Sequence, residues 1–357
     1  MKKVLLITDV IFWERIAGNR TRIYSLIKFL AANVQLTVVC TGPAPADIEI
    51  TLARDFNADF FVLEKKKYLS SNGYGRRLKA FLKDKHFDTV IIEYIHSSYF
   101  LNFLPEDVQV ILDAHDIISE RTEEFRKFNH SGDGYELSKE TEAEIFSVYD
   151  YVMVLCQPDY DKVNAMAGPA KALLCPHTVE PCMHPLREDV KSIVFIASAY
   201  LPNKDAISWF IADCWPQISA KYNVQLSVYG TVAGGIDTSE AQQIYSKGVV
   251  ADLNEIYAAA DIVINPVRFG AGLKIKNLEA LGYGVPLVTT SHGARGMESG
   301  INKAFLVADD AGAFIESVGS LINSLQLRTK LSRTAYKFVS DNYTAEKYFR
   351  PLIDVIQ

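Results

Sequence analysis

The stretch IVINPVRFGAGLKIKNLEALGYGVPLVTT, residues 262–290, contains a strand, a glycine-rich loop, a helix and a second strand in that order. The run IVINP is apolar and β-branched, KIKNLEALGYG has helical spacing, and VPLVTT again favours a strand. A strand, a crossover helix and a parallel strand make up the βαβ unit of α/β proteins. The segment therefore predicts a parallel sheet, with the loop at the carboxyl end of a strand, where such sheets bind ligands.

Two lysines, Lys274 and Lys276, stand at the predicted start of the helix. The unpaired N–H groups of a first helical turn carry partial positive charge, so cations are disfavoured there. An anion bound at this end would reconcile them, and Gly270 and Gly272 would let the backbone approach it closely. The alternative is an ordinary turn followed by a surface pair between Lys276 and Glu279, which share a helix face. The spacing leaves both interpretations open.

The same alternation extends along most of the 357-residue chain. Strand-like runs in the first half are KVLLITDV, VQLTVVC, FFVLE, TVIIEYI, VQVILDAH and YVMVLC, with a long polar, acidic helical stretch at about 116–149. The pattern starts again at SIVFIASA. We therefore expect an α/β protein of two doubly wound, Rossmann-like domains, residues 1–176 and 190–340, with a cleft between them and a proline-rich linker at 177–189.

Composition excludes several classes of protein. The net charge of −6 argues against general nucleic-acid binding, and no stretch approaches the roughly 20 apolar residues that cross a bilayer. The N-terminal run MKKVLLITDV is interpreted as a strand, not as a signal peptide. Five scattered cysteines lack the spacing of a zinc or redox site, which favours a reducing cytoplasm.

One local patch departs from the overall acidity. Residues Lys65 to Lys85 include eight basic side chains against a single acid, Asp84. Such a patch is either a solvated helix face or a docking surface for something anionic, such as a phospholipid membrane. Together with the aromatic pair Phe12-Trp13 in the first loop, this patch leads to the hypothesis that the protein docks at the cytoplasmic face of the inner membrane.

The segment GAGLKIKNLEALGYGVPLVTTSHGARGM, residues 270–297, resembles the signature of the retaining glycosyltransferases of family four. LPNKDAISWF, residues 201–210, is similar to the Pro-Asn-x-Asp-Ala block of a subgroup of that family. The resemblance extends over roughly residues 190–300 and implies the GT-B architecture, two Rossmann-like domains facing a central cleft. It implies that the first domain binds the acceptor, that the second binds a nucleotide sugar, and that a C-terminal helix at 341–357 crosses back to the first domain.

The resemblance also implies a donor site. Glu279 matches the second glutamate of the family's paired motif, which holds ribose hydroxyls, whereas Ala271 stands where the first glutamate is usual. Backbone N–H groups of the glycine loop would then replace that carboxylate. The implied donor-site residues are Gly18, Asn203, Lys204, Gly270, Ala271, Gly272, Leu273, Lys274, Lys276 and Glu279.

On the acceptor side, DAHD follows a predicted strand, and His115 is similar to a histidine that lines the acceptor site of related enzymes. A lone histidine is more often structural, so both roles stay open. Arg20, Asp116 and Arg121 are the other acceptor-side candidates, and Arg22 adds a second cation at a predicted helix start. The catalytic candidates are His115, Lys274, Lys276 and Glu279.

The implied reaction moves a sugar from a nucleotide-diphosphate sugar to a glycan or lipid-linked acceptor with retention of configuration, as in bacterial surface polysaccharide or glycoconjugate assembly. Lysines and a helix N-terminus would stabilise charge on the leaving diphosphate, so we expect no metal and no cofactor. Asp159 and Asp161 resemble the metal motif of another glycosyltransferase architecture but stand alone.

Three alternatives compete with this interpretation. The first is a nucleotide-sugar 2-epimerase or hydrolase of the same architecture, which needs additional carboxylates around the sugar. The second is a nicotinamide-dependent dehydrogenase, which needs Gly-x-Gly-x-x-Gly after the first strand, where this chain has AGNRTR. The third is a non-catalytic two-domain sugar-binding protein; such proteins are commonly exported, and we expect no export signal here.

Overall fold

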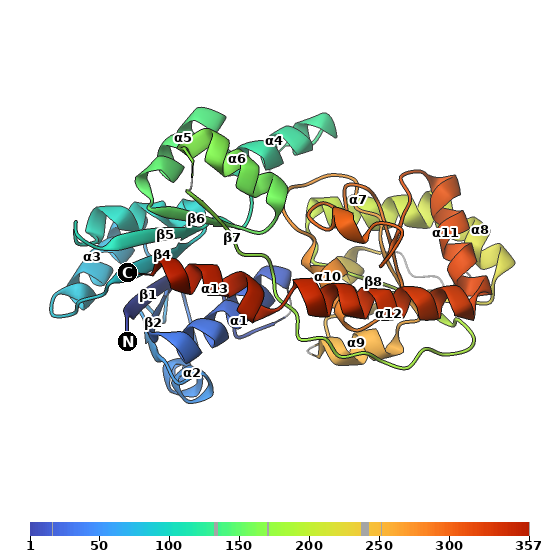
Figure 1. Ribbon diagram of the computed structural model, residues 1–357, viewed down its shortest axis with the longest axis horizontal. Helices are drawn as coiled ribbons and strands as arrows, with labels where there is room; N and C mark the ends of the chain where they lie inside the picture. Colours follow the sequence, from blue (N-terminus) through green and yellow to red (C-terminus); the bar gives the residue numbers. More distant parts are fainter. Residues whose placement is uncertain (16, 132–134, 170, 237–242, 251, 357) are drawn as a thin grey trace. The chain divides into compact units, whose positions relative to one another are not determined.

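The computed structural model describes residues 1–15, 17–131, 135–169, 171–236, 243–250 and 252–356. The chain forms two compact units (Figure 1). Unit 1 comprises Met1–Trp13, Asn19–Pro176 and Ala345–Gln357, and unit 2 comprises Glu14–Gly18 and His177–Thr344. The chain thus passes to unit 2 after Pro176 and returns to unit 1 for its C-terminal segment.

Unit 1 contains a seven-stranded sheet in the order β3-β2-β1-β4-β5-β6-β7, and every neighbouring pair is parallel. Its strands are β1 (Lys3–Thr8), β2 (Gln35–Cys40), β3 (Asp59–Val62), β4 (Thr89–Glu93), β5 (Gln109–Asp113), β6 (Tyr151–Val154) and β7 (Ala172–Leu174). Its helices are α1 (Gly18–Asn33), α2 (Ile48–Phe56), α3 (Ser71–Leu82), the 3-10 segment η1 (Ile95–Phe103), α4 (Ile118–Lys127), α5 (Lys139–Val148), α6 (Gln157–Ala167) and α13 (Ala345–Val355).

Helices cover both faces of this sheet because its central strands are apolar on both sides. In β1, Val4 and Leu6 join one core with side chains of α1, α2 and α13, whereas Leu5 and Ile7 join another with α3, η1, α5 and α6. α13 lies beside α1 (Figure 1), where the rings of Phe29 and Phe349 are 5.5 Å apart.

The helical stretch expected at about 116–149 consists of two separate helices, α4 and α5. α4 ends at Lys127, and Asn129 follows with a φ of 57°, a left-handed backbone that cannot continue a helix. α5 starts anew after Ser138, whose side chain accepts the backbone N–H of Thr141.

Unit 2 contains a six-stranded parallel sheet in the order β10-β9-β8-β11-β12-β13. Its strands are β8 (Ser192–Ile196), β9 (Gln225–Tyr229), β10 (Ile244–Gly248), β11 (Ile262–Asn265), β12 (Leu287–Thr289) and β13 (Leu306–Val307). Its helices are α7 (Leu201–Trp209), the π-helical η2 (Phe210–Cys214), α8 (Trp215–Lys221), η3 (Thr231–Gly235), α9 (Leu253–Ala259), α10 (Ile275–Gly282), η5 (Glu298–Gly300), α11 (Ala311–Asn323) and α12 (Leu325–Asn342).

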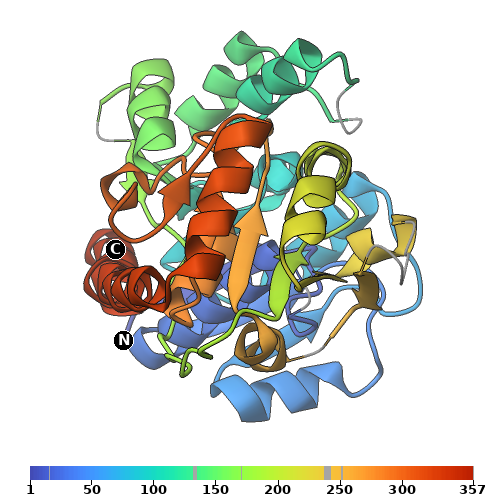
Figure 2. The same ribbon diagram turned by 90° about the vertical axis from the view of Figure 1, so that its right-hand side faces the viewer.

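The helices of unit 2 also form layers. The run from α7 to α8 and helix α11 share one core with the strands, and Figure 2 shows this unit facing the viewer. α10 packs on α12 and β12. In each unit the first six strands have the order 3-2-1-4-5-6, so the expected class, two doubly wound Rossmann-like domains, is confirmed. In the described part of the chain, no helix has the length and apolarity needed to span a membrane.

Candidate functional site

The loop between β11 and α10 bends sharply around the start of α10. Gly270 and Gly272 have φ values of 103° and 70°, the left-handed region that favours glycine. Lys274 occupies the N-cap position of α10, and its Nζ donates to the carbonyl oxygens of Ala271 at 3.0 Å and Gly272 at 2.9 Å. This lysine therefore folds back onto the loop carbonyls instead of lying along the positive helix end.

Lys276 lies in the first turn of α10 and is partly buried. Its Nζ donates to Oδ1 of Asn203 on α7 at 2.5 Å and lies 5.3 Å from the centre of the Phe195 ring. Burial, followed by the charge of Lys274, lowers the pKa of Lys276 to about 7. No described carboxylate forms an ion pair with this cation, so an anionic ligand would supply the missing counter-charge.

Glu279 lies one turn further along α10 and is only 7% exposed. Its Oε2 accepts a hydrogen bond from the Tyr257 hydroxyl at 3.3 Å, and burial raises the pKa of Glu279 to about 7. The alternative of a surface pair between Lys276 and Glu279 is therefore wrong. The carboxyl group instead lies buried beside the helix start.

A buried amide network holds α10 in place. Asn277 is fully buried; its Nδ2 donates to the Gly293 carbonyl at 2.8 Å, and its Oδ1 accepts from Asn265 Nδ2 at 2.8 Å. The Thr289 hydroxyl donates to the Asn265 carbonyl at 2.7 Å. The start of α10 is thus tied to the ends of β11 and β12. This network was not predicted, although the polar residues at the ends of the apolar strands were a signal for it.

The other predicted donor-site residues differ in position. Gly18 packs on α10, because a Cβ at Gly18 would lie 3.1 Å from the Ile275 Cβ. The His292 Nε2 lies 2.6 Å from the Gly270 carbonyl oxygen, and Leu273 is buried. Lys204 is exposed on α7, and no described residue bonds its ammonium group. The structure therefore brings Gly18, Asn203, Lys276 and the glycine loop together, whereas Lys204 is in solvent.

In unit 1, His115 follows β5 and is 6% exposed. Its Nε2 lies 2.7 Å from Oε2 of Glu93, the fully buried last residue of β4. The Tyr94 ring stacks on the imidazole at 4.0 Å. Glu93 was not predicted as a site residue; it ends β4, and the strand register pairs it with Asp113, the last residue of β5.

The backbone is strained at this stack. His115 has a φ of 62°, and Tyr94 has a φ of 65° with a ψ of 139°, a combination that non-glycine residues rarely adopt. Such conformations persist where the surrounding structure imposes them, and they cluster at functional sites. Burial lowers the pKa of His115 to about 4 and raises the pKa of Glu93 to about 8.

Arg22, predicted as a second cation at a helix start, is fully buried in α1. Its guanidinium forms an ion pair with the buried Asp113 and donates to the Cys175 carbonyl at 3.1 Å. Burial raises the pKa of Asp113 against the opposing effect of Arg22. Arg22 therefore joins three parts of unit 1 and is not available to a ligand.

Asp116 and Arg121 form an ion pair at 3.0 Å, and their side chains are 15% and 16% exposed. The contacts of the His115 Nε2 are with Glu93 at 2.7 Å and with Asp113 at 3.8 Å. Arg20 lies partly exposed in the first turn of α1. These three residues remain acceptor-side candidates.

Ligand atoms of Glu93, Asp113 and His115 lie within 4.8 Å of one another, a spacing that could hold a metal ion. Arg22 already pairs with Asp113 here. A guanidinium beside the carboxylate would repel a metal ion, so this donor set does not fit one. Of the Asp-x-Asp pair, Asp159 is buried, and the Asp161 carboxylate accepts from the Gln157 side chain at 2.8 Å.

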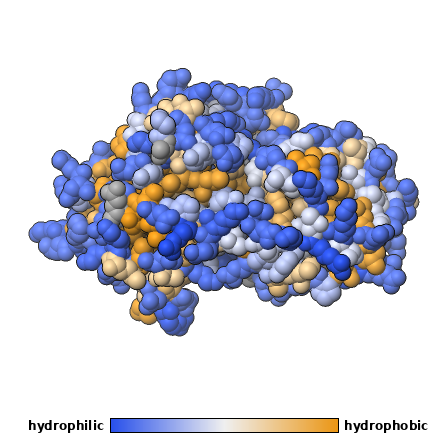
Figure 3. Space-filling model, viewed as in Figure 1, coloured by the Kyte–Doolittle hydropathy of each residue, from blue (hydrophilic) through white to orange (hydrophobic). Residues whose placement is uncertain are grey.

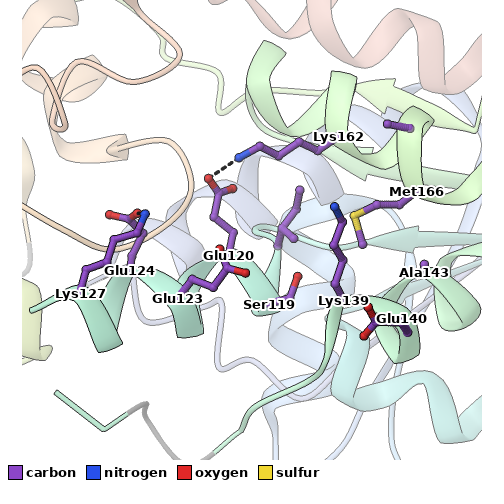
Figure 4. A pocket seen from close by; sticks show the side chains of 12 residues that line it. Ser119, Glu120, Glu123, Glu124, Lys127, Lys139, Glu140, Ala143, Lys162 and Met166 are labelled. Atoms are coloured by element: carbon purple, nitrogen blue, oxygen red, sulfur yellow. Dashed lines mark hydrogen bonds and ion pairs between the residues drawn. The ribbon is translucent and has the colours of Figure 1, made fainter. Parts of the chain in front are cut away.

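A hollow of about 480 Å³ lies among α4, α5 and α6 (Figure 4). Glu120, Glu123 and Glu124 on α4 line it together with lysines from all three helices. Lys162 bonds Glu120, as the dashed line in Figure 4 marks. The hollow therefore offers donors and acceptors of both charges to a neutral, hydroxyl-rich ligand.

The Lys65–Lys85 patch lies on α3 and its flanking loops. Hydrophilic atoms cover the left end of the molecule in Figure 3, where α3 lies in Figure 1. Lys65 pairs with Glu49 at 2.5 Å and Arg77 with Glu64 at 2.8 Å, so part of the expected charge is neutralised.

Three other cations of the patch line an apolar groove of about 630 Å³. Its lining residues are Arg76, Lys79, Ala80, Leu82, Lys83, Phe103, Leu104 and Pro105. Phe12 does not contribute to a docking surface, because it is fully buried against Phe56 and Phe60. The prediction that used the Phe12-Trp13 pair is wrong for Phe12.

Several solved structures share this fold. TarM of S. aureus superposes with a TM-score of 0.77 at 10% identity and covers 100% of both chains. Sucrose-phosphate synthase from Thermosynechococcus elongatus has a TM-score of 0.76 at 13% identity, covering 99% of this chain and 98% of that one. HepE from Anabaena has a TM-score of 0.72 at 13% identity, covering 99% of both.

One curated protein also aligns, an uncharacterised 44.6 kDa protein in the cps region of Klebsiella pneumoniae. It is 24% identical over 228 residues, which make up 59% of this chain and 57% of that protein. The aligned part therefore spans little more than half of that relative. The chain has the GT-B fold of two Rossmann-like domains, and its residues 190–324, which include the loop and helix around Lys276, match the family Glycosyl transferases group 1.

Proposed function

We propose that this protein transfers a sugar from a nucleotide-diphosphate sugar to a glycan or lipid-linked acceptor, with retention of anomeric configuration. The observation that carries the proposal is the start of α10. There, beside a glycine loop, the partly buried Lys276 forms no ion pair with any residue that the structure describes, inside the segment that matches glycosyl transferases group 1. HepE was solved with UDP and glucose, and TarM with UDP and α-GlcNAc-glycerol, which supports a nucleotide-sugar donor.

In this proposal the diphosphate binds the N-terminus of α10. Backbone N–H groups of residues 270–273 and the Lys276 ammonium would stabilise the negative charge that develops as the glycosyl bond breaks. Because such donors are already in place, little reorganisation is needed at the moment of reaction. Glu279 would bind ribose hydroxyls, and the departing phosphate would take the proton of the acceptor hydroxyl.

We further propose that the acceptor binds unit 1 near His115, and that the product belongs to a surface polysaccharide or glycoconjugate. The Klebsiella relative lies in the cps region, which supports the assignment to polysaccharide assembly. The hollow beside α4 begins at Ile117, two residues after His115, and its mixed charges suit sugar hydroxyls.

Nucleoside diphosphates should raise the melting temperature of the protein. A ligand at one hundred times its Kd adds about 2.7 kcal/mol to the free energy of unfolding. For a domain of 150–250 residues this corresponds to roughly 5–10 °C. Differential scanning fluorimetry with UDP, GDP and ADP would show the shift for at least one base, and the double variant K274M/K276M would lose it. Stabilisation by free sugars and by none of the nucleotides would favour a sugar-binding protein instead.

The purified protein should also leave a nucleotide sugar unchanged when no acceptor is present, apart from slow hydrolysis. Proton NMR of such a mixture separates the candidates, because a 2-epimerase would produce a new sugar signal without acceptor. With acceptor, the anomeric coupling constant of the product reports retention or inversion.

We also propose that the Lys65–Lys85 patch docks on anionic membrane lipids. Arg76, Lys79 and Lys83 are exposed, and no described residue pairs with them, while Leu82, Phe103, Leu104 and Pro105 provide an apolar groove between them. Basic residues near an anionic surface contribute about 1 kcal/mol each. An apolar groove ringed by unpaired cations suits the boundary between headgroups and acyl chains.

Reversing these charges in R76E/K79E/K83E should weaken binding to phosphatidylglycerol vesicles at least about tenfold, measured by co-sedimentation. The matched control K330E/R333E/K337E makes the same charge change on exposed residues of α12 and should bind like the wild type. If both variants lost the same amount of vesicle binding, the total charge of the protein and not this patch would explain the binding. If the wild-type protein did not bind the vesicles, the docking proposal would be refuted.

A further inference from the structure

Unit 1 buries a cluster of charged groups that the donor chemistry does not use. Arg22 pairs with Asp113, and His115 bonds Glu93, with all four side chains at most 6% exposed. The Oε1 atom of Glu93 is buried and has no hydrogen-bond partner among the described residues. Two carboxyl groups therefore lie beside a single guanidinium.

Charge balance decides where the protons are in this cluster. Buried charges are tolerated when they are paired, and Arg22 can balance only one carboxylate, Asp113. The remaining pair is neutral overall only if Glu93 and His115 hold one additional proton between them. That proton is either on the carboxyl group, which donates to Nε2, or on Nε2, which donates to the carboxylate; the distance between the two atoms is 2.7 Å. In both states the other ring nitrogen, Nδ1, keeps its own hydrogen.

The charged groups farther out have partners of their own. Asp116, which follows β5, pairs with Arg121 at 3.0 Å. Asp9, which follows β1, lies 2.8 Å from His96. Because each of these carboxylates has its own partner, neither needs a positive charge on His115. Their negative charges nevertheless favour the protonated form of the His115 ring. The raised pKa of Glu93 and the lowered pKa of His115 agree with a neutral pair near pH 7.

We propose that Glu93 is a positioning residue that shares one proton with His115 and thereby fixes the imidazole as an N–H donor, not as a base. Tyr94 stacks on the ring at 4.0 Å and prevents it from turning. No described residue bonds Nδ1, so its N–H can meet an oxygen atom of the substrate. This inference rests on the proposed function only in naming a sugar hydroxyl or acceptor oxygen as that partner.

Histidine NMR tests the proton positions without any need for activity. The protein labelled with ¹⁵N-histidine contains seven histidines, and the variant H115N identifies the His115 signals by their loss. We expect Nδ1 of His115 to stay protonated between about pH 5.5 and pH 8. An unprotonated Nδ1 at neutral pH would overturn the proposal.

Activity tests whether this arrangement matters to the reaction. Glutamine mimics a protonated carboxyl group, because its amide N–H can donate to Nε2 as the carboxyl O–H would. E93Q should therefore keep kcat within about threefold and keep Nδ1 protonated. E93L removes the partner and should lower kcat about 10- to 100-fold with little change in donor KM.

If the carboxylate instead oriented the histidine as a catalytic base, the amide variant would hold the imidazole in the wrong tautomer. In a Ser-His-Asp triad this change lowers kcat about 10⁴-fold. Such a loss in E93Q would overturn the proposal. E142Q is the matched control, since Glu142 is a fully buried glutamate of the same unit that accepts from the Ile118 N–H at 2.6 Å. It should change stability but not the His115 signals. If no variant and no wild type transfers sugar, the proposed function fails, while the NMR result still decides the proton positions.

Discussion

Replacing Lys276 with methionine should lower kcat/KM for the nucleotide-sugar donor about 10²- to 10³-fold, the usual effect of removing one preorganised donor to a developing charge. Methionine keeps the side-chain length and the packing on the Phe195 ring but has no ammonium group. The melting temperature should stay level or rise, because K276M removes a partly buried cation whose pKa is lowered to about 7. Initial rates at varied donor concentration, with the melting temperature measured alongside, check both outcomes.

The control is K204M, which removes an exposed lysine from α7 and should stay within about twofold of the wild type. A second control uses pH. Lys276 loses its proton as the pH rises through about 7, so the diphosphate must then bind together with a proton. The Kd for a nucleoside diphosphate should increase about tenfold per pH unit above 7 in the wild type, and K276R should remove this dependence. Equal activity of K276M and wild type would contradict the assignment.

Replacing Arg22 with methionine should destabilise unit 1 by about 3–5 kcal/mol, because the variant leaves Asp113 as an uncompensated buried charge. Both side chains are fully buried, and Arg22 also donates to the Cys175 carbonyl. Hydrogen exchange followed by mass spectrometry measures the effect locally. Peptides from β4 and β5 should exchange much faster in R22M, while peptides from unit 2 serve as the internal reference.

The double variant R22M/D113L separates the loss of the pair from the loss of packing. Replacing a buried ion pair by apolar residues of similar size often changes the free energy of unfolding little. The double variant should therefore regain most of the protection against hydrogen exchange that R22M loses. If R22M alone exchanged like the wild type, the pair would not hold unit 1 together.

The fold could be predicted from the sequence because its strands are short apolar runs separated by helical periods. Runs such as VLLI and TVII are apolar on both faces, which occurs when helices cover both sides of a parallel sheet. The division of residues 116–149 into two helices was missed, because polar, acidic residues continue beyond the end of α4 at Lys127, where Asn129 takes a left-handed backbone. Helices α2, α6 and α11 and strands β7, β10 and β13 were also not predicted from their short or weakly periodic segments.

The candidate site could be predicted where its chemistry is local in the chain. The glycine loop, Lys274 and Lys276 lie within a few residues, so one motif contains them. Glu93 and His115 are 22 positions apart and meet only because β4 and β5 are neighbours in the sheet. The pairing of Arg22 with Asp113 was not predicted, because the position of an arginine in a helix does not tell whether it meets a buried carboxylate.

The central claim is that a diphosphate binds at the N-terminus of α10. A crystal structure of the protein with a bound nucleoside diphosphate tests it most directly. We expect phosphate oxygens within hydrogen-bond distance of the Lys276 Nζ and of backbone N–H groups in residues 270–273. A nucleotide bound with its phosphates elsewhere, and Lys276 still bonded only to Asn203, would contradict the claim.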